Sequence, residues 1–345
     1  MKLVTFTVHT EERLGALVGE NVLDLNSAYA SYLKESEGRE NTRLWANAAV
    51  PPCMKSFLSG GDESMAAAEK AMIHVGEDMS ALGPDGERLL LPFGDVRLRA
   101  PVPVPGKVYC VALNFSDHAT ERIGDPEERR REMERLHSLN LKVPVIFQKP
   151  PSLVVSPNDP VIKPRVSERL DYECELAVVI GKRGKYIPQD RAYEHVAGYT
   201  ILIDVSFRDQ GYPADVDFNF YKRDINWTKG KGMDNAAPMG PCLVTKDEIP
   251  DPYDLAIKLW VNGELRQDYN TDDMSHKLPA KIKFLSEICT LNPGDVMACG
   301  TNHHGLGPLQ DGDVCEMEIE RIGRLSFNVV DPHKRVWDVK EHTRP

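Results

Sequence analysis

The chain has 345 residues, of which 41% are hydrophobic and 28% are charged, a composition typical of a globular protein and unlike collagen, coiled coil or disordered sequence. Its net charge of −11 argues against a surface that neutralises nucleic-acid phosphates. No apolar run approaches the roughly 18 residues of a membrane span, and the first residues turn acidic before an apolar signal region could form. We therefore expect a cytoplasmic protein without nucleic-acid or membrane partners.

The first part of the chain contains short strand-like runs at residues 2–8, 15–18 and 22–25. Residues 62–82 repeat alanine and methionine on one face with helical spacing. Prolines between residues 92 and 105 then prevent a helix or a central strand from continuing. We therefore predict a small N-terminal α+β domain over residues 1–100 and a larger domain over residues 101–345.

The larger domain consists mainly of short β-type runs separated by turn residues. These runs cover residues 107–113, 143–148, 176–180, 196–204, 256–261, 296–299, 314–319 and 325–330. Asn262-Gly263 predicts a type I′ hairpin turn, because both central positions of that turn need positive φ. Residues 117–139 are polar with helical propensity, and two interpretations stay open: a solvated helix held by ion pairs, or a mobile lid. The predicted fold class is α+β, predominantly β.

Cysteines are dispersed along the chain, and no CxxC pair occurs among the seven. Most of them lie inside apolar stretches. This distribution predicts buried thiols, and not disulfides or zinc ligands.

The stretch RLDYECELAVVIGK, residues 169–182, places two carboxylates beside an apolar run. In a strand, Glu173 and Glu175 project from the same face, because side chains alternate. Such a pair needs a cation, a shared proton or exposure to water, so a metal site and a plain surface position both stay open. Asp204, at the end of the next apolar strand, favours the metal, since three oxygen ligands suit Mg²⁺, Mn²⁺ or Ca²⁺.

Six motifs follow one another along the chain: ALNFSDHATE, LDYECELAVVIGK, GYTILIDVSFRD, KGKGMDNAAPMGP, VNGELRQDYNTDDM and LNPGDVMACGT. In this order they resemble the fumarylacetoacetate hydrolase family over about residues 104–330. Residues 1–26 resemble the N-terminal module that many members carry. The resemblance implies a mixed β-sheet roll, often assembled as a homodimer, that acts on a small-molecule 2-oxo or 2,4-dioxo acid.

The resemblance also assigns roles to a metal site and to a pair that activates water. Glu173, Glu175 and Asp204 match the family's metal carboxylates, which bind Mg²⁺ or a similar cation. His118 and Glu121 match the dyad that activates water in acylpyruvate-cleaving members. Their spacing of three residues would place the two side chains on one face of a helix.

Further residues are implied to contact the substrate. Lys231 matches a lysine that stabilises developing negative charge. Contacts with the substrate's oxygens are implied at Arg208, Gln210, Thr301 and Lys149. From charge alone, Arg208 could instead form an ion pair with Asp204 or Asp209, and this interpretation stays open.

Three stretches depart from the family pattern, and one is the long, charged segment between His118 and Glu173 that could form the lid named above. After Gly300-Thr301 the family usually has proline and small residues, whereas this chain has His303 and His304, either substrate-recognising residues or ordinary loop residues. Residues 211–228 are longer and more aromatic than expected. Their aromatic side chains could line a substrate wall or pack at a subunit contact; they are Phe218, Phe220, Tyr221 and Trp227.

These features predict a divalent-metal-dependent hydrolase that cleaves a carbon–carbon bond in a 2,4-dioxo acid of acylpyruvate or fumarylpyruvate type, in the breakdown of an aromatic compound. The metal would stabilise an enolate, while His118 removes a proton from water. A decarboxylase, an enol–keto isomerase and a hydratase use the same enolate and stay alternatives. A non-catalytic binding protein stabilised by its metal is a third interpretation.

Overall fold

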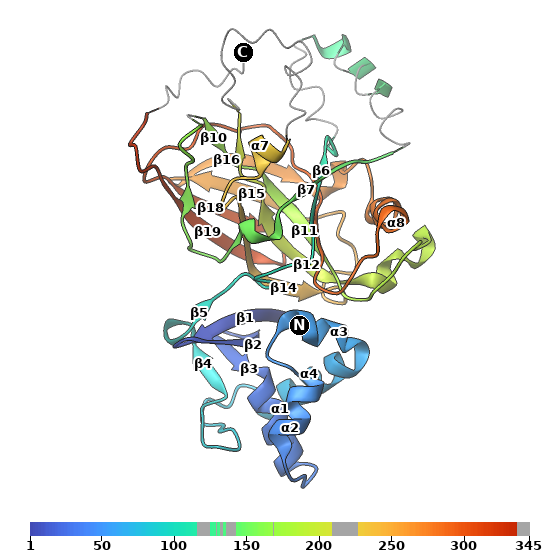
Figure 1. The fold of residues 1–345 in the computed structure, drawn as a ribbon, viewed down its shortest axis with the longest axis vertical. Helices are drawn as coiled ribbons and strands as arrows, with labels where there is room; N and C mark the ends of the chain where they lie inside the picture. The colour runs from blue at the N-terminus through green and yellow to red at the C-terminus, as the bar shows by residue number, and fades with distance from the viewer. Residues whose placement is uncertain are drawn as a thin grey trace.

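The computed structural model describes residues 1–115, 125–128, 130–131, 134–135, 143–167, 169–208 and 227–336. In these residues helices and strands both occur and strands predominate, as the sequence predicts. Figure 1 shows the N-terminal region, residues 1–100, beside the C-terminal region. No helix among the described residues is long and apolar enough to cross a membrane.

The N-terminal region begins with a three-stranded meander that is followed by helices. Its elements are β1 (Lys2–Val8), β2 (Glu11–Val18), β3 (Asn21–Asp24), α1 (Leu25–Glu35), α2 (Thr42–Ala49), α3 (Met54–Ser59), α4 (Gly61–Val75), β4 (Leu90–Pro92) and β5 (Arg97–Leu98). Asp24 caps α1 by accepting a hydrogen bond from Ser27 N at 3.0 Å. The helix predicted over residues 62–82 is shorter than expected, because α4 ends at Gly76, whose φ of 57° lies outside the range of a right-handed helix.

One large sheet passes through both regions. Its C-terminal strands are β6 (Val108–Ala112), β7 (Val145–Lys149), β8 (Val154–Val155), β11 (Cys174–Ile180), β12 (Val196–Ile203), β14 (Ala237–Thr245) and β17 (Val296–Ala298). The strand order is β4-β3-β2-β1-β14-β12-β11-β17-β6-β7, with β5 beside β1 and β8 beside β14. The pairing of β1 with β14 therefore joins the N-terminal region to the sheet that carries the site.

A second sheet of five strands packs against the C-terminal part of the first, where β19 contacts β14 and β15 contacts β11. It has the order β16 (Glu264–Asn270), β15 (Ala256–Val261), β18 (Val314–Ile319), β19 (Gly323–Val330) and β9 (Val161–Ile162). Asn262 and Gly263 have φ values of 51° and 81°, which confirms the predicted hairpin turn. Every residue of β11 is buried because one face packs in this C-terminal core and the other faces the N-terminal core.

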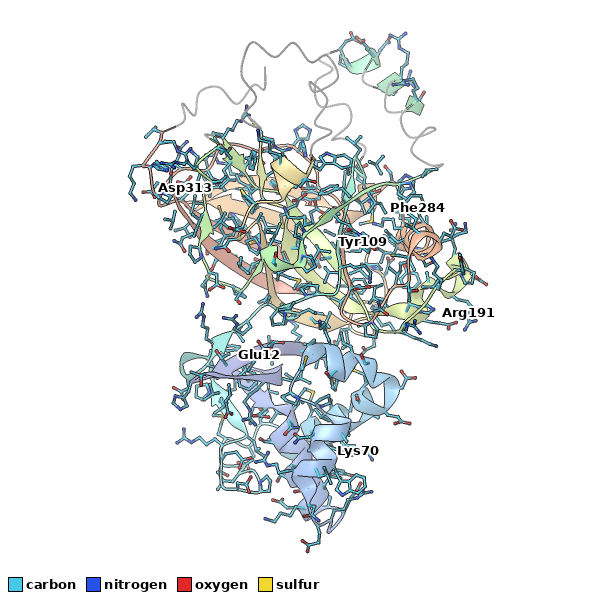
Figure 2. All side chains as sticks on the ribbon, in the orientation of Figure 1. Glu12, Lys70, Tyr109, Arg191, Phe284 and Asp313 are labelled. Atoms are coloured by element: carbon cyan, nitrogen blue, oxygen red, sulfur yellow. The ribbon has the colours of Figure 1, made fainter. Side chains whose placement is uncertain are left out.

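Shorter elements complete the fold. They are β10 (Leu170–Asp171) paired with β13 (Ser206–Phe207), the helices α7 (Trp227–Lys231) and α8 (Leu278–Ile288), and the 3-10 turns Phe93–Asp95, Pro151–Leu153, Gln189–His195 and Thr271–Asp273. Tyr109 on β6 lies inside the C-terminal region (Figure 2). All seven cysteines are free thiols; five are buried, but Cys53 is exposed and Cys289 is partly exposed, contrary to expectation.

Candidate metal centre

Three carboxylates meet where two neighbouring strands begin and end. Glu173 directly precedes β11, Glu175 is its second residue, and Asp204 directly follows β12. Because β11 and β12 are antiparallel, with Glu175 opposite Leu202, the start of one strand lies beside the end of the other. Asp204 N donates to Glu173 O at 2.9 Å and fixes this register.

The cluster is buried and compact. Glu173, Glu175 and Asp204 are 4%, 2% and 1% exposed, which excludes the surface interpretation of the two glutamates. One oxygen from each residue can be chosen so that all three lie within 4.8 Å of one another. Three convergent carboxylate oxygens suit a hard divalent cation.

Two buried lysines compensate part of this negative charge. Lys231 Nζ, at the end of α7, lies 2.6 Å from Glu173 Oε2 and 2.8 Å from Asp204 Oδ2. Lys149 Nζ, at the end of β7, lies 2.6 Å from Asp204 Oδ1 and donates to Val205 O at 3.1 Å. Both lysines predicted from the sequence therefore reach the triad.

Arg208 contacts different carboxylates from those that its charge alone suggested. Its Nε lies 2.6 Å from Asp171 Oδ2, and its guanidinium also bonds Glu173 Oε1. The reason is topological: Arg208 follows β13, which pairs with β10, where Asp171 lies. An ion pair with Asp204 was one of the open interpretations, but these two contacts stand in its place, and Asp209 lies outside the described residues.

The protonation of the two glutamates is pushed in opposite directions. Burial raises the pKa of Glu175 well above its ordinary value, and the neighbouring Asp204 and Glu173 raise it further. Burial also acts to raise the pKa of Glu173, but Lys231, Arg208 and His303 outweigh it and hold that pKa well below its usual range. Burial would lower the pKa of Lys231, whereas Asp204 and Glu173 raise it on balance. A bound divalent cation would relieve the repulsion at Glu175.

A loop after β17 supports the triad. Gly300 N donates to Glu175 Oε2 at 2.6 Å. Thr301 is buried, and its Oγ1 lies 3.1 Å from both Gln267 Nε2 and Tyr269 Oη. Gln267 and Tyr269 are two residues apart on β16 and therefore share a face.

Four supporting groups were not identified from the sequence: Asp171, Gln267, Tyr269 and the N–H of Gly300. The alternation of Gln267 and Tyr269 within VNGELRQDYN was the available signal.

His118, Glu121 and Gln210 lie outside the described residues. Trp227 begins α7 and packs against the ring of Phe147, at 4.8 Å between centroids. The other aromatic residues of the 211–228 stretch lie outside the described residues.

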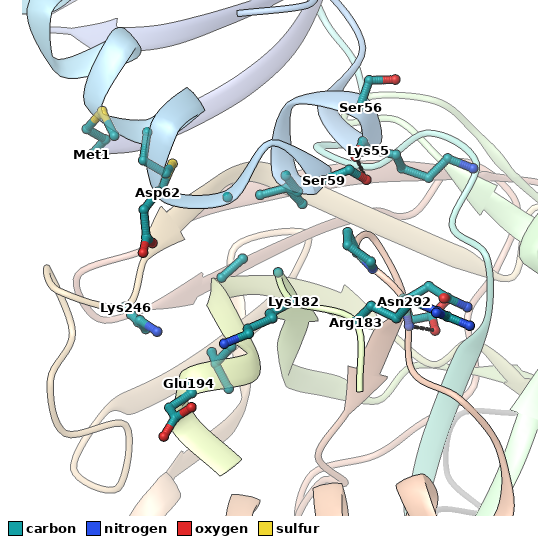
Figure 3. A pocket seen from close by; sticks show the side chains of 18 of the residues that line it. Met1, Lys55, Ser56, Ser59, Asp62, Lys182, Arg183, Glu194, Lys246 and Asn292 are labelled. Carbon is teal, nitrogen blue, oxygen red and sulfur yellow. Dashed lines mark hydrogen bonds between the residues drawn. The ribbon is translucent and has the colours of Figure 1, made fainter. Parts of the chain in front are cut away.

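A separate cavity of about 1130 Å³ lies between the two regions (Figure 3). Lys55 and Asp62 line it from the N-terminal region, and Lys182 and Lys246 line it from the C-terminal region. None of the three carboxylates of the triad is among its lining residues. The metal centre is thus distinct from this cavity.

Comparison with known proteins identifies the class of enzyme. Residues 107–330 match the model of the fumarylacetoacetate hydrolase C-terminal domain. The chain therefore belongs to the fumarylacetoacetate hydrolase family, and with the buried triad it is an enzyme of that family. The expected family resemblance and fold are both confirmed.

Individual relatives differ in the reaction that their names describe. A mitochondrial oxaloacetate tautomerase of Xenopus laevis is 35% identical over 320 residues, covering 90% of this chain and 83% of that protein. A maleylpyruvate hydrolase from Sphingobium, solved with manganese(II) and pyruvate, shares 28% identity at a TM-score of 0.67, covering 96% and 99% of the two chains. A 5-carboxymethyl-2-hydroxymuconate delta-isomerase from Mycobacterium smegmatis shares 27% at a TM-score of 0.64, covering 96% and 100%.

Proposed function

We propose that the protein is a divalent-metal-dependent tautomerase that interconverts the enol and keto forms of a small 2-oxo dicarboxylic acid of the oxaloacetate type. The observation that carries this proposal is the buried triad Glu173, Glu175 and Asp204 with Lys231 bridging two of its members. The similarity to oxaloacetate tautomerases along most of the chain supports it. An enol–keto isomerase is one of the alternatives that the sequence predicts.

The reaction needs a proton transfer and a means of stabilising negative charge. The enol loses the proton of its C2 hydroxyl and gains one at C3, so no carbon–carbon bond breaks and no oxidant is required. A divalent ion held by the triad would supply a Lewis acid for the oxygen at C2. Lys231 holds a second positive charge beside the same carboxylates, in a buried setting where electrostatic stabilisation is strong.

Other predicted residues divide into supporting and contacting roles in this proposal. Lys149 is 1% exposed and bonded to Asp204, so it fits a role in orienting that carboxylate. The Thr301 hydroxyl is shared between Gln267 and Tyr269, which suits it to fixing the loop. Arg208, with its guanidinium between Asp171 and Glu173, is the group we assign to the substrate's carboxylate.

Cleavage of a carbon–carbon bond in a 2,4-dioxo acid is the second candidate function. The similarity to a maleylpyruvate hydrolase that was solved with manganese and pyruvate favours it. Hydrolysis additionally requires an activated water, and we assign that role to His118 and Glu121, with Gln210 at the substrate. Tautomerisation is preferred because the chain is 35% identical to an oxaloacetate tautomerase and 28% identical to the maleylpyruvate hydrolase.

Product analysis distinguishes the candidates. Protein reconstituted with Mn²⁺ or Mg²⁺ is incubated with enol-oxaloacetate, with maleylpyruvate and with acylpyruvates, and the products are followed by NMR and mass spectrometry. The proposal predicts faster ketonisation of enol-oxaloacetate with every carbon retained. Pyruvate with a carboxylic acid would identify the hydrolase, and CO₂ release would identify a decarboxylase. Stabilisation by metal without any turnover would indicate the non-catalytic protein.

The cellular setting extends this proposal. We assign Mg²⁺ as the physiological ion, a homodimer as the assembly, and the cytoplasm as the location, as the sequence and the family resemblance imply. A role in aromatic catabolism would follow if the hydrolase were identified. Sedimentation velocity of the purified protein tests the dimer, and the metal content of protein isolated from its native cells tests the ion.

A further inference from the structure

The loop from Gly300 to Leu306 is held rigidly on several sides. Gln267 Nε2 donates to Asn302 O at 2.6 Å, and Tyr172 Oη donates to Gly305 O at 2.7 Å. Asn302 Oδ1 accepts from His304 N at 2.8 Å within the loop. Gln267 lies on β16 and Tyr172 lies between β10 and β11, so the C-terminal fold determines where this loop lies.

This loop contacts two of the three triad carboxylates. At its start, Gly300 N donates to Glu175 Oε2 at 2.6 Å. Three residues later, His303 Nε2 lies 3.1 Å from Glu173 Oε1, and the imidazole is only 7% exposed. The adjacent His304 is exposed. The two histidines that depart from the family pattern therefore occupy different environments, and one of them is directed at the triad.

The two oxygens of Glu173 have different surroundings. Among the described residues, Arg208 and His303 contact Oε1, whereas the contact at Oε2 is made by Lys231, at 2.6 Å. A carboxylate oxygen has about two lone-pair positions. With its proton on Nε2, His303 fills the second position on Oε1. With Lys231 in one position, Oε2 has its second position left for an ion.

We propose that His303 is a positioning residue that makes Glu173 a one-oxygen ligand, through Oε2, and thereby favours Mg²⁺ or Mn²⁺ over Ca²⁺. Ca²⁺ is bound by roughly six to eight oxygens, and a carboxylate can supply it with one oxygen or with both. Mg²⁺ requires a nearly octahedral set of single oxygens. Occupation of Oε1 by two protein donors removes the two-oxygen mode, which is open to Ca²⁺.

Titration of ions into metal-stripped protein tests this role independently of catalysis. Isothermal titration calorimetry with Mn²⁺, Mg²⁺ and Ca²⁺ is performed on the wild type, His303→Ala, His303→Gln and the matched control His304→Ala. We expect His303→Ala to weaken Mn²⁺ binding by about 10- to 100-fold, the usual effect of losing a partner of a metal ligand. Ca²⁺ binding should weaken less or strengthen. His303→Gln, which keeps an N–H donor, should restore most of the preference, and His304→Ala should match the wild type.

The proposal is overturned if His303→Ala binds all ions as the wild type does, or if it loses affinity for Mn²⁺ and Ca²⁺ by the same factor. Thermal unfolding in EDTA verifies that each variant is folded, and His303→Phe provides a bulkier variant without a donor if the alanine variant is not. The inference rests on the proposed function only through the metal. The protein could show the expected ion preference without accelerating the ketonisation of oxaloacetate. That result would overturn the proposed tautomerase function and leave the role of His303 in place.

Discussion

Lys231 Nζ lies 2.6 Å from Glu173 Oε2, which makes a buried lysine the direct partner of a proposed metal ligand. The same ammonium lies 2.8 Å from Asp204 Oδ2. Because Glu173 precedes β11 and Asp204 follows β12, one cation links the ends of two neighbouring strands. The positive charge of Lys231 therefore holds two strand ends together and also lies where the reaction would occur.

Replacing Lys231 by methionine should reduce catalysis much more than substrate binding. The variant keeps an unbranched side chain but loses the positive charge beside the developing enolate, so we expect kcat for enol-oxaloacetate to fall by about 10²- to 10³-fold. Steady-state kinetics measure kcat and KM separately. Lys229→Met, in the same helix, is the control and should retain near-wild-type kcat. Equal losses in the two variants would contradict this role for Lys231.

The metal-free protein should show opposite pH effects at the two glutamates. The pKa of Glu175 is raised by burial, Asp204 and Glu173, so its contribution to stability is fully present below the ordinary glutamate pKa and is lost as the pH rises through the raised value. Glu175→Gln cannot ionise, so the variant does not lose this stability. In EDTA, the melting temperature of the variant minus that of the wild type should therefore increase with pH. Differential scanning calorimetry across the acidic to neutral range measures the difference.

Glu173 provides the counterpart to this measurement. Its pKa is held low because Lys231, Arg208 and His303 outweigh the effect of burial, so its stabilisation is present above the ordinary glutamate pKa and is lost as the pH falls through the lowered value. Glu173→Gln should therefore be most destabilising at neutral pH and less so in acid. Parallel pH profiles for the two variants would show that the assigned charge environments are wrong.

Gly305 should tolerate a side chain less well than another glycine of similar backbone conformation. Gly305 and Gly312 have φ values of +77° and +85°, but a Cβ on Gly305 would lie 1.5 Å from Arg266 O, whereas Gly312 has nothing within 4 Å. Gly312→Ala should cost about 1–2 kcal/mol from the left-handed backbone alone. Gly305→Ala should cost more and also weaken Mn²⁺ binding. Urea unfolding and ion titration measure both, and equal costs would contradict the close approach.

Gln267 should be required for a stable loop at the metal centre. It accepts from Cys174 N at 3.2 Å and donates to Asn302 O at 2.6 Å in a fully buried setting. Gln267→Leu removes the acceptor of the buried Cys174 N–H, at about 1–3 kcal/mol, and leaves Asn302 O without the amide donor beside the Thr301 hydroxyl, which lies 3.1 Å from it. Chemical denaturation measures the loss, with the exposed neighbour substitution Asp268→Asn as the control. A leucine variant as stable as wild type would argue against the structural role of these bonds.

Local pattern predicts a large part of the fold. The strands predicted at residues 256–261 and 314–319 have the same first and last residues as β15 and β18. Alternating apolar and polar side chains identify each strand, and nearby turn residues set its ends. Helix α8 was not predicted, because its short sequence includes Lys281, which is fully buried where a lysine on a helix normally marks the solvent face. Its burial depends on tertiary packing.

The triad itself was accessible from the sequence, whereas its partners were not. Glu173, Glu175 and Asp204 lie at strand ends that a hydrophobic pattern reveals. The contacts of Arg208 with Asp171 and Glu173, and of His303 with Glu173, join residues that are 35 or more positions apart. Such contacts depend on strand pairing and loop placement, which no local spacing encodes.

In the proposed function, the triad holds a divalent ion that drives enol–keto interconversion. The most direct test of this function is the rate of enol-oxaloacetate ketonisation by wild-type protein and by Asp204→Asn, each stripped of metal and then titrated with Mn²⁺, against the buffer rate. We expect the stripped wild type to return to the buffer rate, Mn²⁺ to restore its activity in a saturable manner, and Asp204→Asn to gain little. Full activity in the stripped protein, or equal restoration of Asp204→Asn at the same ion concentration, would contradict this function.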